Sequence, residues 1–203
     1  MANNKEFFHR RLHSLLGVIP VGLFLTVHLL INYSATRGPE AYNKASGFMA
    51  NLPFLLILEF LLIYIPIVYH AIYGVYIAFT AKHNFNRFGF FRNWMFLLQR
   101  ITGIFLVIFI AWHVWETRLQ KAFFGAEVNF DMMANIVDNP WMLAFYIVGI
   151  LSATFHLSNG LWSFLVSWGI TVTPRSQRIL TYVTMLFFIF LSYVGISAIL
   201  AFA

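Results

Sequence analysis

Five long apolar segments separated by polar stretches dominate the chain. They cover approximately residues 13–33, 53–81, 94–117, 141–169 and 179–203. A helix needs roughly 20 apolar residues to cross a bilayer, and each segment reaches that length. Helices are expected throughout, because backbone polar groups in lipid need partners within their own segment. The pattern therefore predicts an all-α, polytopic membrane protein with five transmembrane helices.

Composition supports a membrane protein. The 203 residues are 61% hydrophobic and only 10% charged, whereas soluble domains carry about 25% charged residues. Pro20 and Pro66 lie inside apolar segments and predict kinks. The polar start, residues 1–11, leads into an apolar run longer than a signal-peptide core, so no cleavable signal is expected. The absence of cysteine excludes disulfides, thiolate metal sites and haem attached through C-x-x-C-H.

The polar connections alternate in charge. The N-terminal segment and the connections around 82–93 and 170–178 contain eight basic residues and one acid, Glu6. The other two connections balance four basic residues against four acids. Basic loops remain in the cytoplasm, so the N-terminus is expected inside and the C-terminus outside. The eight basic residues are Lys5, Arg10, Arg11, Lys82, Arg87, Arg92, Arg175 and Arg178.

This basic inner face has two compatible interpretations. It attracts anionic lipid and sets the topology, or it also docks a soluble partner. Nucleic acid is not an expected partner, because topology already explains the basic residues.

Four of the seven histidines lie inside apolar segments: His28, His70, His113 and His156. Ionisable residues in a membrane are costly and usually face the interior of a helix bundle. A rise of about 1.5 Å per residue gives the depth of each one. Because 13–33 and 94–117 run outward while the next segments run inward, His28 matches His113 in depth, and His70 matches His156. We call His28 and His113 the outer pair and His70 and His156 the inner pair.

Two short motifs strengthen the inner pair. "YHAIYG" (69–74) and "FHLSNG" (155–160) both read aromatic-His-x-x-x-Gly. Residues four apart share a helix face, so Gly74 and Gly160 are expected to leave room beside each histidine for a wide, flat group. Ordinary helix packing is the alternative explanation for the glycines, and a helix–helix hydrogen bond is the alternative for a single histidine.

Facing histidines in a helix bundle suit a b-type haem. Two imidazoles fill both axial positions, which favours electron transfer over oxygen chemistry. Zinc is disfavoured, because the histidines lie at two levels without a carboxylate or thiol beside them. At the inner end, His13, Ser14 and Arg100 are expected to contact haem propionates. The arginine could instead extend to phospholipid headgroups.

Two acids lie near the outer side. Glu59 is about two turns into the segment 53–81 and is a possible proton donor at a quinone site, provided that burial raises its pKa. Glu116 follows His113 by three residues and is interpreted as an interface residue paired with Arg118 or with a neighbouring loop. The tryptophans on either side of His113, at 112 and 115, fit an interfacial belt or the wall of a site for a flat ring.

Seven stretches carry a family resemblance that is specific when they are taken together. They are "FFHRRLHSLLGVIPVG" (7–22), "YHAIYGVYIAFTAKHN" (69–84), "FRNWMFLLQRITGI" (91–104), "AWHVWETR" (111–118), "GAEVNFDMMANI" (125–136), "HLSNGLWSF" (156–164) and "WGITVTPRSQR" (168–178). With the two histidine pairs, they resemble the dihaem cytochrome b membrane anchors of succinate:quinone oxidoreductases. The likeness is to the single-anchor, two-haem type called cytochrome b558.

The resemblance implies one transmembrane cytochrome b domain over residues 1–203 in the cytoplasmic membrane. It would anchor a flavoprotein subunit, where succinate is oxidised, and an iron–sulfur subunit, both on the cytoplasmic face. Electrons would pass from iron–sulfur clusters to the inner haem (His70 and His156) and then to the outer haem (His28 and His113). Menaquinone would be reduced near the outer haem.

Three alternatives remain at this point. Fumarate reductase anchors share the layout and run in reverse, but they commonly carry a glutamate near the haem ligand of the fourth helix, where this chain reads "SATFHLSN" (152–159). Another dihaem protein, such as a cytochrome b561-like or hydrogenase-type b subunit, is the second. A transporter or proton channel is the third, although the chain shows no internal repeats or discontinuous helix pairs.

Overall fold

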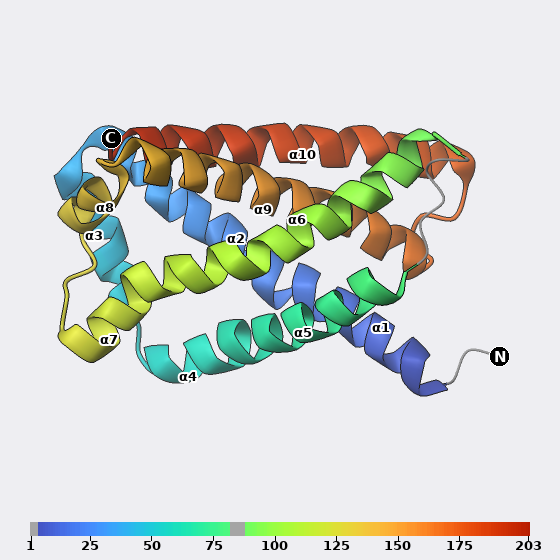
Figure 1. Cartoon of the computed structure of the whole chain (residues 1–203), viewed down its shortest axis with the longest axis horizontal. Helices are drawn as coiled ribbons and strands as arrows, with labels where there is room; N and C mark the ends of the chain where they lie inside the picture. Colours follow the sequence, from blue (N-terminus) through green and yellow to red (C-terminus); the bar gives the residue numbers. More distant parts are fainter. Residues whose placement is uncertain (1–3, 82–87) are drawn as a thin grey trace.

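The computed structural model describes residues 4–81 and 88–203, and these form a bundle of long helices (Figure 1). Within the described residues, five helical segments are long and apolar enough to cross a membrane, which confirms the predicted fold class. They are Asn4–Arg37, Leu55–Thr80, Phe91–Phe124, Pro140–Ser167 and Pro174–Leu200. The first and third extend well beyond the apolar runs, because their polar ends continue the helix.

Three of these segments are composite. The first joins α1 (Asn4–Val18), α2 (Pro20–Asn32) and a 3-10 turn (Tyr33–Arg37). The second joins α4 (Leu55–Glu59), a π-helical segment (Phe60–Tyr64) and α5 (Ile65–Thr80). The third joins α6 (Phe91–Val114), a π-helical segment (Trp115–Leu119) and α7 (Gln120–Phe124). The last two are single helices, α9 (Pro140–Ser167) and α10 (Pro174–Leu200).

Both predicted proline irregularities coincide with interruptions of the α-helix. Pro20 is the first residue of α2, directly after the break at Ile19. Pro66 is the second residue of α5 and follows the π-helical segment Phe60–Tyr64. Proline lacks an N–H and its ring collides with the preceding turn, so the helix widens or breaks on its N-terminal side.

The two ends of the bundle differ. The start of α1 lies at one end with the end of α5, the start of α6 and the α9–α10 connection, and we call this the amino-terminal end (Figure 1). The C-terminus lies at the other, carboxy-terminal end. Arg92, Arg175 and Arg178 share the amino-terminal end with α1, as the charge argument requires, whereas Lys82 and Arg87 lie outside the described residues. Which end faces the cytoplasm remains a prediction.

Two short helices, which the sequence pattern did not predict, cover the carboxy-terminal end. They are α3 (Pro39–Ala50) and α8 (Phe130–Val137). The side chain of Asn129 caps α8 by accepting the N–H of Met132 at 2.9 Å. The N–H of Phe130 donates to Asn43 Oδ1 at 2.8 Å and ties α8 to α3. Buried apolar side chains from both helices join the end of α10 in one cluster that includes Tyr42, Met133, Val137 and Phe202.

Burial is concentrated on α9 and α10, which pack along each other (Figure 1). Leu191 on α10 is completely buried, and the hydroxyls of Thr154 and Ser192 lie 2.8 Å apart between the two helices. The segment α4–α5 instead exposes many large apolar side chains, among them Leu56, Leu61 and Ile72. Exposed apolar surface of this kind is what a lipid-facing helix presents.

Candidate functional site

The structure brings the four intramembrane histidines together in the two pairs that depth predicts. The rings of His28 on α2 and His113 on α6 have centroids 5.9 Å apart and planes at 73°. The rings of His70 on α5 and His156 on α9 have centroids 6.0 Å apart and planes at 88°. His70 contacts His13, which lies about four turns before His28 along the first membrane segment, so the two pairs lie at different levels. Each pair joins two different transmembrane segments.

Hydrogen bonds fix the tautomer of the inner pair. His70 Nδ1 lies 2.9 Å from the carbonyl oxygen of His13, and His156 Nδ1 lies 3.1 Å from the carbonyl oxygen of Gln99. A carbonyl oxygen only accepts, so both Nδ1 atoms are the N–H donors. In a neutral imidazole the other nitrogen, Nε2, then carries the lone pair that binds a metal. Both rings are thus held in the form that a metal ligand requires.

The outer pair is held differently. His113 Nδ1 lies 3.2 Å from the hydroxyl of Tyr146, which lies 3.2 Å from Glu116 Oε2. The side chain of Asn32 donates to the carbonyl oxygen of His28 at 2.8 Å and also lies 3.4 Å from His28 Nε2. Metal binding by His28 through Nε2 would displace this weak amide contact.

Two glycines that the sequence analysis did not single out make room for the inner rings. A Cβ atom at Gly17 would lie 2.2 Å from Cε1 of His70, and one at Gly103 would lie 3.0 Å from Cε1 of His156. Both distances are too short for carbon atoms in contact. An Ala in either place would push the histidine away from its partner.

Gly74 and Gly160, which the sequence predicts to leave room for a flat group, face side chains of the neighbouring helices. A Cβ atom at Gly74 would meet His13 at 3.1 Å, and one at Gly160 would meet Gln99 at 3.3 Å, so neither glycine lies against the histidine four residues before it. The helix α1 runs antiparallel to α5, and α6 runs antiparallel to α9. Gly74 therefore faces the residue four before Gly17, and Gly160 faces the residue four before Gly103. The sequence signal was present as His-x-x-x-Gly at 13–17 and Gln-x-x-x-Gly at 99–103.

Buried nitrogens without a hydrogen-bond partner in the described part of the chain occur on α1 and α6, the helices whose backbone carbonyls accept from the inner pair. The ring of His13 stacks on His70 with centroids 4.1 Å apart and planes at 7°. Among the described residues, His13 Nε2, Arg11 Nη1 and Arg100 Nε are buried without a hydrogen-bond partner. Buried guanidinium N–H groups, and Nε2 of His13 in the tautomer that carries the proton there, are satisfied by an acceptor that binds beside them. Carboxylates such as haem propionates would satisfy them, and Ser14, also a predicted contact, is half-buried in the same helix.

The acids at the carboxy-terminal end have other partners than predicted. Arg118 makes two hydrogen bonds to Glu59, at 2.7 and 3.1 Å, and not to Glu116 as interpreted from the sequence. Residues two apart on a helix point to different sides, so Glu116 faces Tyr146 while Arg118 faces α4. Trp112 and Trp115 are 47% and 48% exposed, which favours the interfacial belt over the wall of a site.

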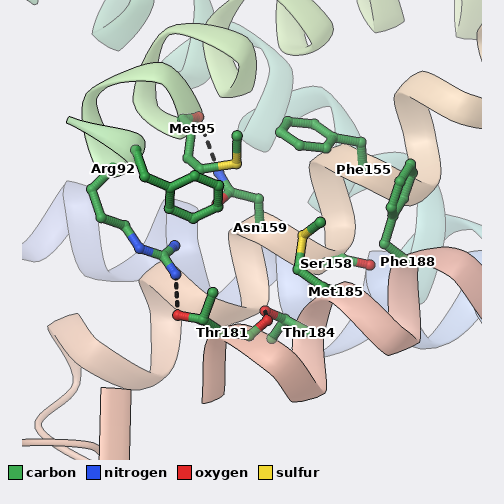
Figure 2. A pocket seen from close by; sticks show the side chains of 10 residues that line it. Arg92, Met95, Phe155, Ser158, Asn159, Thr181, Thr184, Met185 and Phe188 are labelled. Carbon is green, nitrogen blue, oxygen red and sulfur yellow. Dashed lines mark hydrogen bonds between the residues drawn. The ribbon is translucent and has the colours of Figure 1, made fainter. Parts of the chain in front are cut away.

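A small cavity lies between α6, α9 and α10 near the inner pair (Figure 2). Arg92 donates to the hydroxyl of Thr181 across one side of it. Asn159, in its wall, donates to Gln99 Oε1 at 2.8 Å, and Gln99 Nε2 donates in turn to the carbonyl oxygen of His156 at 3.0 Å. The cavity wall therefore supports the backbone that positions His156.

The residues of both pairs fit a haem. A metal–imidazole bond is about 2 Å long, so rings bonded to opposite sides of one ion have centroids about 6 Å apart. The observed separations, 5.9 and 6.0 Å, agree with that value. In residues 4–81 and 88–203 no three His, Asp or Glu side chains form a group that could hold an ion. Two protein ligands suffice for haem iron, since the porphyrin supplies the rest.

Fold and site together define a class: a multi-pass helical protein of the cell membrane with two histidine pairs inside its bundle. Comparison with known families adds the family itself. Residues 87–196 match the succinate dehydrogenase/fumarate reductase transmembrane subunit family, and the chain belongs to it. It is accordingly a membrane subunit of an enzyme complex, with catalysis on another subunit.

Two curated relatives illustrate the range of similarity. The succinate dehydrogenase cytochrome b558 subunit of Bacillus subtilis (strain 168) is 64% identical over 202 residues, which is 100% of both chains. The succinate dehydrogenase hydrophobic membrane anchor subunit of Thermoplasma acidophilum is 36% identical over 64 residues, 31% of this chain and 50% of the relative. Membership in the family argues against the transporter and the cytochrome b561-like or hydrogenase-type alternatives.

Proposed function

We propose that the chain is the membrane anchor and electron-transfer subunit of a succinate dehydrogenase. Residues 1–203 would form one transmembrane cytochrome b domain holding two b-type haems. The observation that carries the proposal is the pair of facing histidines at each of two levels of the bundle. Full-length similarity to a subunit named cytochrome b558 supports b-type haem as the cofactor.

His70 and His156 are the proposed axial ligands of the inner haem, and His28 and His113 those of the outer haem. A b-type haem so bound supplies a one-electron carrier with both axial positions filled. Hydrogen bonds at Nδ1 orient the rings of His70, His113 and His156. His13, Ser14 and Arg100 are the proposed propionate contacts, supported for His13 and Arg100 by their unpartnered buried nitrogens.

The direction of transfer follows from the proposed topology. A flavoprotein subunit and an iron–sulfur subunit would dock at the cytoplasmic face, which the charge pattern assigns to the amino-terminal end. The protein would then carry electrons from that face to menaquinone near the outer face. Moving one charge outward is worth about 2.3 kcal/mol per 100 mV of membrane potential, enough to drive a nearly balanced reduction.

Glu59 is the proposed proton donor to menaquinone. It lies at the carboxy-terminal end, beside the π-helical segment Phe60–Tyr64. π-Helical segments often mark functional sites. Its carboxylate is held by Arg118, so proton delivery from Glu59 would require this ion pair to open.

The test uses the complex purified with its partner subunits. Succinate is expected to reduce both haems, seen as low-spin b-type absorption, and to drive reduction of a menaquinone analogue. His113→Ala should abolish quinone reduction and leave the inner haem reducible by succinate. A complex without haem would contradict the proposal, and faster quinol-driven fumarate reduction would favour the fumarate reductase alternative.

A further inference from the structure

Three side chains form a hydrogen-bonded chain behind one outer histidine. Tyr146 on α9 is only 3% exposed, and its hydroxyl lies 3.2 Å from both His113 Nδ1 and Glu116 Oε2. His113 and Glu116 are three residues apart where α6 passes into the π-helical segment, so both face α9. Glu116 belongs to the π-helical segment Trp115–Leu119.

The donor and acceptor of each of these two hydrogen bonds follow from the chemistry of the groups. An ionised carboxylate only accepts, so the hydroxyl of Tyr146 donates to Glu116. The same oxygen then accepts the Nδ1–H of His113. The carboxylate therefore orients the tyrosine, and the tyrosine holds the imidazole with Nε2 toward His28.

This arrangement distinguishes His113 from the inner histidines. His70 and His156 each donate Nδ1–H to a neutral backbone carbonyl, of His13 and Gln99. Of the four histidines, and within the described residues, only His113 contacts a tyrosine hydroxyl that in turn donates to a carboxylate. The carboxylate polarises the Tyr146 hydroxyl that accepts the Nδ1–H of His113, which makes the ligating nitrogen more basic and stabilises the oxidised metal.

We propose that Glu116, acting through Tyr146, is a positioning residue that fixes the orientation of His113 and lowers the reduction potential of the outer haem. This rests on the proposed function, since it assumes that His113 ligates that haem. Electrons would then leave the bundle at the haem with the greater driving force toward a low-potential quinone.

The test is a redox titration of the purified complex, followed in the haem absorption bands. Tyr146→Phe and Glu116→Gln should each raise the midpoint potential of the outer haem, by about 59 mV for a tenfold change in a one-electron equilibrium. The inner haem should keep its potential and serves as an internal control. Tyr42→Phe is the matched control, because Tyr42 is equally buried at the same end without a recorded hydrogen bond to a histidine among the described residues.

The double variant Tyr146→Phe/Glu116→Gln distinguishes an action of Glu116 through Tyr146 from a direct effect of its charge on the haem. If Glu116 acts through Tyr146, Glu116→Gln should add little to the shift already caused by Tyr146→Phe, because coupled residues are not additive. Fully additive shifts of the outer-haem midpoint potential would contradict an action through Tyr146. An unchanged outer-haem potential in Glu116→Gln would contradict it as well. If Tyr146→Phe loses the outer haem, the outer-haem midpoint potential of Glu116→Gln alone tests the proposal. A wild-type complex without a second haem would contradict the proposed function instead.

Discussion

At the residue scale, the inner pair is built by a reciprocal contact between antiparallel helices. His70 lies against Gly17 while Gly74 lies against His13, and the same relation joins His156 with Gly103. In each case the histidine also donates to the carbonyl of the residue four before that glycine, which is His13 or Gln99. One five-residue motif, at 13–17 on α1 and at 99–103 on α6, thus provides both the space for the ring and the acceptor that orients it.

Substituting the facing glycines tests this contact. Gly17→Ala places a methyl group 2.2 Å from Cε1 of His70, and Gly103→Ala places one 3.0 Å from Cε1 of His156. We expect both to reduce inner-haem occupancy, with the larger loss in Gly17→Ala, measured as haem per protein. Gly47→Ala is the control, since no described atom lies within 4 Å of its added methyl group. Full inner-haem occupancy in Gly17→Ala would disprove the tight contact.

Single histidine substitutions test the pairing. His113→Ala should remove the outer haem and spare the inner one, because the two pairs share no residue. His70→Ala should do the opposite. Absorption and electron paramagnetic resonance spectra of the two variants measure which haem remains. Loss of the inner haem in His113→Ala would show that the ligands are paired in another way.

At the element scale, the sequence predicts the long helices better than their ends and connections. The apolar runs locate all five membrane segments, because apolar length alone decides whether a segment can span lipid. The helices α3 and α8 were missed, since they are short and owe their stability to packing on the end of α10. Asn129 before α8 is a capping signal that could have indicated that helix.

The ion pair between α4 and the third membrane segment makes a prediction about stability. The side chains of Glu59 and Arg118 are 14% and 31% exposed, so the pair is partly buried. Arg118→Leu leaves Glu59 without its partner and should cost about 2 kcal/mol, between the values of exposed and buried pairs. The thermal midpoint in detergent should fall and recover partly in Glu59→Leu/Arg118→Leu. A double variant less stable than Arg118→Leu would contradict this account.

At the scale of the whole molecule, depth along the helices predicted which histidines meet, and the structure has both pairs. It could not predict which side chains support them. Tyr146 is one of nine tyrosines and carries no motif, so its position behind His113 depends on how α9 packs against α6. Which acid pairs with Arg118 likewise depends on how α4 packs against the third membrane segment.

Because the chain contains no cysteine, single cysteines can report its topology. Lys44→Cys and Glu127→Cys, in the connections at the carboxy-terminal end, should react with a membrane-impermeant thiol reagent on intact cells. Lys5→Cys and Arg175→Cys should react only after permeabilisation. The reverse pattern would place the C-terminus inside and invert the proposed direction of electron transfer.

The central claim is that this bundle holds two haems, one between each histidine pair. A redox titration of the purified complex, combined with the ratio of haem to protein, tests it most directly. The account predicts two b-type haems per chain, titrating as two one-electron steps at different potentials. A single haem per chain, or none, would contradict it.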